Sequence, residues 1–263
     1  MKRFKIYHDD DIIGGQIPDS WEEITVKQWA AMRPNSEPIE LLSIFSNIDL
    51  SHLENTRADL SPIIQHIYEK LILNGMNELD HRPRKDLSIL GHQIKFPKDL
   101  NFERYGQKFM LKKLTQDKDD MREIVADALA IYAQPLIDGK FDGHKLEPIK
   151  KAIESLPIVL AFPWCVFFFE ELKRIEDDII SRLAAVPMTA EQTKMNSFFE
   201  MAGSKRLEKW GDFMLIDQLC KSYPQYTHDD IWEMEVIFVN NLILLNREMG
   251  YVNSKTQEIQ RKS

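Results

Sequence analysis

The sequence predicts a mainly α-helical protein, with a multi-helix bundle-like architecture and a small β-hairpin or three-strand patch in the N-terminal half. Apolar residues recur at spacings of three and four along most of the chain, which is the period of a helix with one buried face. Several of these segments follow helix-start signals. Between residues 81 and 113, β-branched or aromatic residues separated by Gly, Pro and Asn favour short strands instead. With 263 residues, 43% of them hydrophobic, the chain can bury a substantial core.

The segment IPDSWEEITVKQW, residues 17–29, contains two overlapping helix-start signals. Capping boxes can begin at Ser20 and at Thr25, each with Glu or Gln three residues later. Only the second is flanked by an apolar pair, Ile24 and Trp29, that can pack as a hydrophobic staple. We therefore predict that the helix begins at Thr25.

Residues 17–24 should form a strand end and a turn, because Pro18 biases the residue before it toward extended geometry. This path directs Trp21 and Trp29 toward the interior. Large aromatic side chains mostly serve packing, so two core tryptophans are favoured over a ligand site.

Further elements follow from the same signals in the N-terminal half. In chain order we predict a short strand at residues 2–7, a turn at Gly14-Gly15, a helix from Pro38 through Ile48, a helical turn at 50–60, a helix from Ser61-Pro62 to Ile72 that ends at Asn74-Gly75, and short strands within LSILGHQIKFP (87–97) and KFMLKKL (108–114).

The C-terminal half is predicted to be helical between breaks at proline and glycine. We first predict a helix at 121–136 broken by Pro135, a loop at 137–145, and one or two long helices at 146–186 with kinks or breaks at Pro157 and Pro163. A new helix starts at Thr189–Gln192. Helices at 207–223 and 229–249 follow, the second opened by a capping box at Thr227, and the polar tail at 252–263 should be frayed.

This pattern suggests four regions along the chain. They are an N-terminal α+β region at 1–118, a central helical region at 119–183, a linker at 184–206 and a C-terminal helical region at 207–263.

Charge and cysteine usage restrict the class of protein. The formal net charge is −8 and no long basic stripe is present, which argues against nucleic acid as a partner. The two cysteines, Cys165 and Cys220, are far apart and resemble neither a disulfide framework nor a metal knuckle, so a reducing cytoplasm is expected. The apolar run at 156–169 contains two prolines and falls short of the ~20 residues that span a bilayer, so no membrane partner is expected. The N-terminus lacks the apolar stretch of a signal peptide.

The sequence contains no recognisable catalytic pattern, so we predict a protein that is not an enzyme. The segment HDDD at residues 8–11 fits a solvated acidic turn better than a metal site, because four adjacent side chains cannot converge on one ion from regular structure. His81 and His92 lack ligand-spaced neighbours, and the paired acids at 170–171 and 177–178 fit a solvated helix face. Cys165 lies in an apolar setting that disfavours the thiolate. We therefore predict no catalytic, cofactor-binding or metal site.

Apolar helical surface is the remaining feature that could bind a partner. It is concentrated in two segments, where ordinary core packing is the competing explanation. The residues predicted to bind a partner are Phe162, Trp164, Phe167, Phe168, Val236, Val239, Leu242 and Ile243.

Three stretches of the sequence carry a family resemblance. The first joins PDSWEEITVKQWAAM (18–32), with its Pro-x-Ser-Trp and Thr-x-x-Gln entry, to a helix, an Ile-Asp-x-x-x-Leu turn and a second helix ending at residue 71. The second is GQKFMLKKLTQDKDDMREIVADALAIYAQP (106–135), and the third is the Trp-Gly helix and Asp-x-x-x-x-Met helix of residues 209–246. Together they resemble the tail assembly chaperone-like proteins of tailed bacteriophages, although this chain is longer than the shortest of them.

The resemblance implies a non-enzymatic morphogenesis factor that acts in the bacterial host cytoplasm. Such a factor binds the tape measure protein, or another phage tail protein, and keeps it soluble until the tail tube closes around it. Apolar grooves that accept amphipathic helices would suit this task. A homo-oligomer is one of the arrangements that the sequence allows. The alternatives are a virion structural protein, such as a head-tail connector or baseplate component, and an unrelated helical protein-interaction module.

Overall fold

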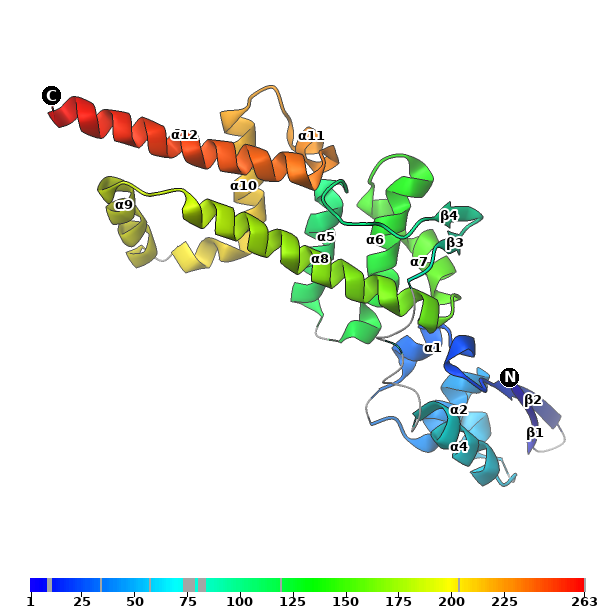
Figure 1. The fold of residues 1–263 in the computed structure, drawn as a ribbon. Helices are drawn as coiled ribbons and strands as arrows, with labels where there is room; N and C mark the ends of the chain where they lie inside the picture. Colours follow the sequence, from blue (N-terminus) through cyan, green and yellow to red (C-terminus); the bar gives the residue numbers. More distant parts are fainter. Residues whose placement is uncertain are drawn as a thin grey trace. The chain divides into compact units, whose positions relative to one another are not determined.

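The computed structural model describes residues 1–8, 11–33, 35–56, 58–72, 79, 84–118, 120–202 and 204–262. The protein is mainly α-helical with two small two-stranded antiparallel sheets, which confirms the predicted fold class (Figure 1). Three sequence predictions fall on residues outside the described ranges. They are the centre of the acidic turn within residues 8–11, the helix end at Asn74-Gly75, and the setting of His81.

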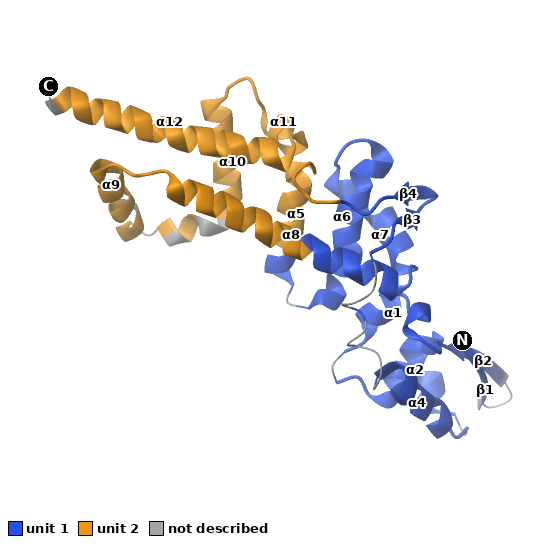
Figure 2. Cartoon of the chain, in the orientation of Figure 1, with its two compact units in different colours: residues 1–97, 114–168 blue, residues 98–113, 169–263 orange. Residues whose placement is uncertain are grey.

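Contacts divide the chain into two compact units, each built from two separate stretches of sequence (Figure 2). Unit 1 comprises residues 1–97 and 114–168, and unit 2 comprises residues 98–113 and 169–263. The division into four regions that we expect from the sequence stays a prediction. The segment expected to be a linker, 184–206, contains helix α9 (Ala190–Met201).

Unit 1 begins with a β-hairpin of β1 (Lys2–His8) and β2 (Asp11–Ile17), paired in the register Lys2↔Ile17. The turn predicted at Gly14-Gly15 is wrong, because both glycines lie within β2. The reason is the ring of Phe4 on the partner strand. A Cβ on Gly15 would lie 2.4 Å from Cζ of Phe4, so the strand requires a glycine where the ring approaches the backbone.

The chain chooses the second of the two helix starts. After the 3₁₀ turn η1 (Trp21–Glu23), α1 (Val26–Ala31) begins with a complete capping box in which Thr25 and Gln28 bond reciprocally. The hydroxyl of Ser20 makes no capping bond. Trp21 and Trp29 are both buried, as predicted.

The next helices follow their sequence signals. They are α2 (Pro38–Ser46), α3 (Leu50–Glu54), α4 (Ser61–Ile67) and the π-helical turn η2 (Tyr68–Ile72). Proline occupies the first turn of α2 and of α4, where its missing N–H costs nothing.

The predicted β patch is confirmed as a hairpin and is wrong as a three-strand patch. β3 (Leu87–Ile89) and β4 (His92–Ile94) pair through a tight turn at Leu90 and Gly91, which both have positive φ. The segment KFMLKKL is instead part of helix α5 (Tyr105–Asp117). A short apolar run cannot distinguish strand from helix by itself, whereas Lys, Met and Leu are good helix formers.

Prolines interrupt the following helices less than predicted. After η4 (Met121–Glu123), α6 (Val125–Asp138) continues through Pro135 and ends at Gly139, which adopts the left-handed conformation. Pro135 removes one hydrogen bond from the helix, but the buried side chains of Ile131 and Tyr132 just before it hold the helix by packing. The loop predicted at 137–145 includes η5 (Gly143–Lys145), and α7 (Leu146–Glu154) follows. The chain breaks at Pro157 as predicted, but α8 (Ile158–Ala185) continues through Pro163.

Unit 2 contains the remaining helices. They are α9, η6 (Ser204–Trp210), α10 (Gly211–Ser222), α11 (His228–Glu233) and α12 (Val236–Lys262). The helix starts predicted at Thr189 and Thr227 are confirmed by complete capping boxes.

Two predictions for the C-terminus are wrong. The helix expected at 229–249 is interrupted because the main chain of Met234 and Glu235 leaves the helix to pair with residues 101–105, where Tyr105 N donates to Met234 O at 2.8 Å. The tail expected to fray continues α12 as far as Lys262.

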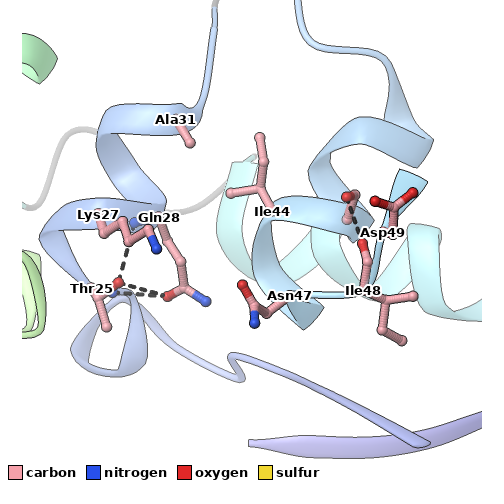
Figure 3. Close-up of a pocket in the computed structure, with 9 residues that line it drawn as sticks. Thr25, Lys27, Gln28, Ala31, Ile44, Asn47, Ile48 and Asp49 are labelled. Atoms are coloured by element: carbon pink, nitrogen blue, oxygen red, sulfur yellow. Dashed lines mark hydrogen bonds between the residues drawn. The ribbon is translucent and has the colours of Figure 1, made fainter. Parts of the chain in front are cut away.

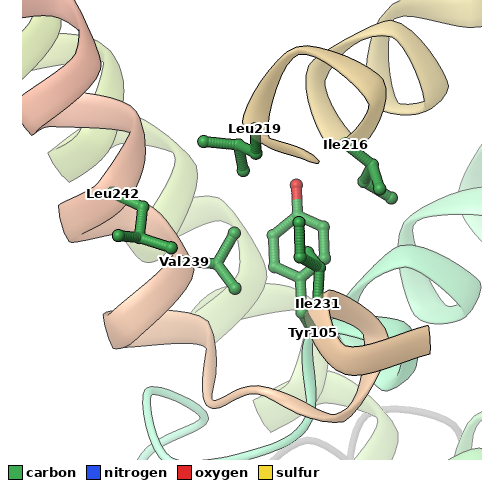
Figure 4. Packing of buried hydrophobic residues seen from close by; sticks show 6 residues of the cluster. All are labelled: Tyr105, Ile216, Leu219, Ile231, Val239 and Leu242. Carbon is green, nitrogen blue, oxygen red and sulfur yellow. The ribbon is translucent and has the colours of Figure 1, made fainter. Parts of the chain in front are cut away.

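The core of unit 2 surrounds the ring of Tyr105. Figure 4 shows the ring between side chains from α10, α11 and α12. The cluster consists of Tyr105, Ile216, Leu219, Ile231, Val239 and Leu242. Segment 98–113 thus supplies the centre around which the C-terminal helices pack. Among the described residues, no helix is both long and apolar enough to cross a membrane.

Candidate protein-binding surface

The aromatic residues predicted to bind a partner in α8 form the core of unit 1. Trp164 and Phe168 are almost completely buried, Phe167 is buried, and Phe162 is half-buried. The Trp164 ring contacts the rings of Phe96, Tyr132 and Phe168. Its indole nitrogen donates to the carbonyl of Lys85 at 2.8 Å. These side chains therefore hold α8 against α6 and the β3–β4 hairpin.

The second predicted set lies in the core of unit 2. Val236, Val239 and Leu242 are buried, and Ile243 packs against the Tyr105 cluster in a half-buried position. Of these eight residues, Phe162 and Ile243 are half-buried, and Ile243 lines a hollow of about 310 Å³ in unit 2, whereas the other six are buried. A direct contact between these eight residues and a partner stays a prediction.

The apolar surface that sequence reasoning missed lies on α9, η6 and α10. Seven large apolar side chains there are exposed, from 39% for Leu207 to 71% for Met201. We call this set the α9–α10 surface. Its members are Met195, Phe198, Met201, Leu207, Trp210, Phe213 and Met214. The signal was present in sequence as the three-residue spacing of Met195, Phe198 and Met201, but it lay in the segment assigned to a linker.

Polar contacts attach helix α9 to α12. Its capping box begins at buried Thr189, the amide of Gln192 donates to the carbonyl of Gly250 at 3.3 Å, and Glu191 pairs with Arg261 at 3.0 Å. None of the α9 side chains that the structure describes is buried. A helix whose apolar side chains remain exposed is expected to be covered by a partner.

A hollow of about 620 Å³ lies between α9 and α10. Leu207, Met214 and Leu215 provide its apolar lining. Its polar lining includes Asn196, Glu200, Asp217, Gln218 and Lys221. Asp217 pairs with Lys221 at 2.6 Å. A hollow lined by both apolar and polar side chains suits an amphipathic helix.

A polar cluster links α5 to α8 and α10. Lys112 lies 3.3 Å from Glu176 and 3.6 Å from Asp212. Burial acts to lower the pKa of Lys112, but the charges of Asp212 and Glu176 outweigh it and the net shift is upward. Burial lowers the pKa of Lys108, whose ammonium lies over the Tyr105 ring. Burial also raises the pKa of Tyr105. These groups are arranged as an ion-pair network around a packed ring.

Unit 1 has a hollow of about 540 Å³ between α1 and the α2–α3 turn (Figure 3). Gln28 is the central polar residue there. Its side-chain oxygen accepts from Thr25 N at 3.0 Å, and its nitrogen donates to the carbonyl of Phe45 at 3.0 Å. The polar atoms of Gln28 are thus engaged in joining α1 to α2.

The two cysteines lie in settings that disfavour the reactive thiolate. Cys165 is buried, and burial raises the pKa of its thiol. Cys220 is half-buried, and its thiol pKa is also raised, first by burial and then by Asp217. Over the ranges that the structure describes, no three His, Cys, Asp or Glu side chains are grouped to hold a metal ion.

Comparison with protein-family models, with curated proteins and with solved structures finds no match to this chain. The features that bear on function are therefore the α9–α10 surface and the resemblance carried by the sequence motifs.

Proposed function

We propose that this chain is a non-enzymatic phage morphogenesis factor that binds the tape measure protein in the bacterial host cytoplasm and keeps it soluble during tail assembly. The observation that supports the proposal most directly is the α9–α10 surface, a run of exposed apolar side chains on a helix with no buried side chain among those described. The client segment is an amphipathic helix that lies in the hollow between α9 and α10.

The composition of the surface suits a client with many similar binding segments. Met195, Met201 and Met214 contribute to it, and all three are exposed. Methionine is unbranched and polarizable, so a methionine-rich surface adapts to helices of different sequence. A tape measure protein is a very long helical chain, and a chaperone must bind it at several places without demanding one motif.

Charge favours a client helix with basic flanks. Among the lining residues that the structure describes, the hollow carries the carboxylates of Glu200 and Asp217 and the ammonium of Lys221. The chain as a whole has a formal charge of −8, which also keeps a complex dispersed. Binding should therefore weaken as ionic strength rises.

The test is co-expression with the tape measure protein encoded near this chain's gene. The wild-type chain should move the tape measure protein into the soluble fraction and copurify with it. The triple variant Met195→Ser, Phe198→Ser, Met201→Ser should lose both effects, because each change removes exposed apolar area from the surface.

Two exposed apolar residues that do not belong to the α9–α10 surface provide the control. Ile12→Ser and Phe102→Ser remove similar apolar area at positions that are 60% and 64% exposed. These variants should retain client binding, and circular dichroism should show unchanged helix content in all of them. If the triple variant binds as well as the controls do, the α9–α10 surface is not the client site.

Purified virions distinguish this function from the structural alternative. A chaperone leaves when the tail tube polymerises, so the chain should be absent from mature particles. Its recovery there in stoichiometric amount would replace the proposal with a connector or baseplate role.

A further inference from the structure

Helix α12 carries a second apolar stripe on the side opposite its buried face. The stripe consists of Leu245, Met249, Val252, Thr256 and Ile259. These residues repeat at alternating spacings of four and three, which is the heptad pattern of a coiled-coil seam. All five are exposed, with Val252 at 56%. Leu242, the preceding member of the series, is buried, so the exposed seam begins at Leu245.

The other face of α12 is the one that attaches to unit 2. Val236 and Val239 pack in the core, the Gly250 carbonyl accepts from Gln192 of α9, and Arg261 pairs with Glu191 of α9. These positions lie about 100° or more around the helix from the middle of the stripe, at 100° per residue. The stripe is thus a separate surface from both the core and the α9–α10 surface.

We propose that the α12 stripe is a self-association surface, on which a second copy of this chain pairs in the antiparallel direction as a two-stranded coiled coil. In this register Leu245 faces Thr256 of the second copy, and Met249 faces Val252 of the second copy. The two-fold axis passes between residues 250 and 251. The hydroxyl of Thr256 already donates to the carbonyl of Val252 at 2.9 Å, so it can enter an apolar seam without losing a partner.

Charge selects a second copy over an unrelated helix. The heptads of the stripe begin at Met249 and Thr256, and Glu248 and Lys255 are the residues just before these two positions. In an antiparallel pair, the residues at this flanking position on the two helices lie beside each other. The register above therefore places Glu248 beside Lys255 of the second copy, and the two-fold axis repeats the ion pair. On the other flank, Asn246 lies beside Asn253 of the second copy. Lys255 now pairs with Glu258 of its own helix at 2.9 Å, an exposed contact that it can exchange or share.

The same residues select the antiparallel direction over the parallel one. In a parallel pair, Glu248 would lie beside Asn253 and Lys255 beside Gln260 of the second copy, so no interhelical ion pair would form. The inference does not depend on the proposed function, because the stripe and the α9–α10 surface share no residue.

The first experiment measures mass against concentration by sedimentation equilibrium on the full chain. The mass should rise from the 30.9 kDa of one chain towards twice that value across roughly three decades of concentration. The double variant Met249→Glu, Val252→Glu should remain monomeric with unchanged helix content, because both positions are exposed in the single chain. Gln257→Glu, an exposed change outside the stripe, is the matched control and should dimerise as the wild type does.

A charge exchange tests the ion pairs. Glu248→Lys alone, or Lys255→Glu alone, should place like charges together and raise the dissociation constant roughly tenfold. The double exchange Glu248→Lys, Lys255→Glu should restore wild-type affinity. A simple loss of helix stability would not be repaired by the second change.

Disulfide trapping tests direction, in a Cys220→Ser background that removes the half-buried native thiol. A mixture of Leu245→Cys and Thr256→Cys chains should form a mixed disulfide dimer, while each variant alone should not. Self-crosslinking of the single variants without the mixed product would indicate a parallel pair and overturn the proposal. A wild-type chain that stays monomeric throughout the concentration range would overturn it as well.

Discussion

The indole nitrogen of Trp164 donates a 2.8 Å hydrogen bond to the main-chain carbonyl of Lys85, 79 residues earlier in the chain. Trp164 itself is 1% exposed, and its ring lies edge-on to Phe96, which follows the β3–β4 hairpin. One side chain thus fixes both the entry to the hairpin and the segment that leaves it. Trp164 is a packing residue with one polar contact, which explains why an aromatic-rich helix segment need not be a partner surface.

Replacing Trp164 by smaller side chains should destabilise unit 1, and the loss should grow with the size of the truncation. Trp164→Phe removes the hydrogen bond and part of the ring contact and should lower the free energy of unfolding by about 1–2 kcal/mol. Trp164→Ala leaves a cavity and should lower it by about 3–5 kcal/mol. Urea unfolding followed by circular dichroism measures both. Trp210→Phe is the control, since Trp210 is 51% exposed and the change should stay within about 0.5 kcal/mol.

The two capping-box patterns near the N-terminus should differ in their contribution to stability. Thr25 accepts from Gln28 N at 3.2 Å, so Thr25→Ala should lower the free energy of unfolding by about 1 kcal/mol. Ser20→Ala should change it by less than about 0.5 kcal/mol, because the Ser20 hydroxyl makes no capping bond. Equal losses in urea unfolding would contradict the assignment of the helix start.

The adjacent glycines of β2 form a matched pair for testing the first hairpin. A Cβ on Gly15 would meet the Phe4 ring at 2.4 Å and Cδ1 of Ile48 at 2.8 Å, so Gly15→Ala should cost about 1–3 kcal/mol. A Cβ on Gly14 would meet nothing within 4 Å, and Gly14→Ala should be neutral or stabilising by up to about 1 kcal/mol. Thermal unfolding of the two variants in parallel gives the comparison. A lower melting temperature for Gly14→Ala than for Gly15→Ala would count against this packing.

Acid should weaken the start of α11. The backbone N–H of Thr227 and then its hydroxyl donate to Asp230, and they hold the pKa of this carboxyl below its ordinary value of 3.8. A lowered folded-state pKa means that the stabilisation is present above the unfolded value and is lost as pH falls through the folded value. The stability advantage of the wild type over Asp230→Asn should therefore be full at neutral pH and decline below about pH 4. Urea midpoints measured from neutral pH down to the acid range test this.

Asp229→Asn is the matched control for removing one acidic charge from the same turn, because Asp229 takes no part in the capping box. Its difference from wild type should vary less with pH than that of Asp230→Asn. An Asp230→Asn difference that grows on acidification would contradict the direction of the pKa shift.

Local signals predicted the helix starts at Thr25, Pro38, Thr189 and Thr227, because a cap is decided by a few adjacent residues. The errors arose where a distant segment decides the outcome. The helix expected at 229–249 breaks because Met234 pairs with Tyr105 through the main chain, and Gly15 lies in a strand because of the Phe4 ring. Contacts of this kind are set by the tertiary fold and leave little trace in a short window of sequence.

The α9–α10 surface shows the same contrast between what local sequence predicts and what the tertiary fold decides. Sequence reasoning found the most apolar segments, and those segments became the cores that hold Phe168 and Val239. The exposed apolar residues are dispersed among polar ones, as Met195, Phe198 and Met201 are in α9, so average hydrophobicity does not reveal them. Their helical spacing can be read from the sequence, but the exposure of these α9 side chains could be known only from the fold.

The interleaved composition of the two units has a consequence for biosynthesis. Unit 1 has all of its sequence once residue 168 has left the ribosome, whereas the core around Tyr105 also requires residues as far as Leu242. During translation, segment 98–113 must therefore wait for partners that are made more than a hundred residues later. A premature stop before α11 would remove Ile231, Val239 and Leu242 from around Tyr105, and such fragments should be prone to aggregation and degradation.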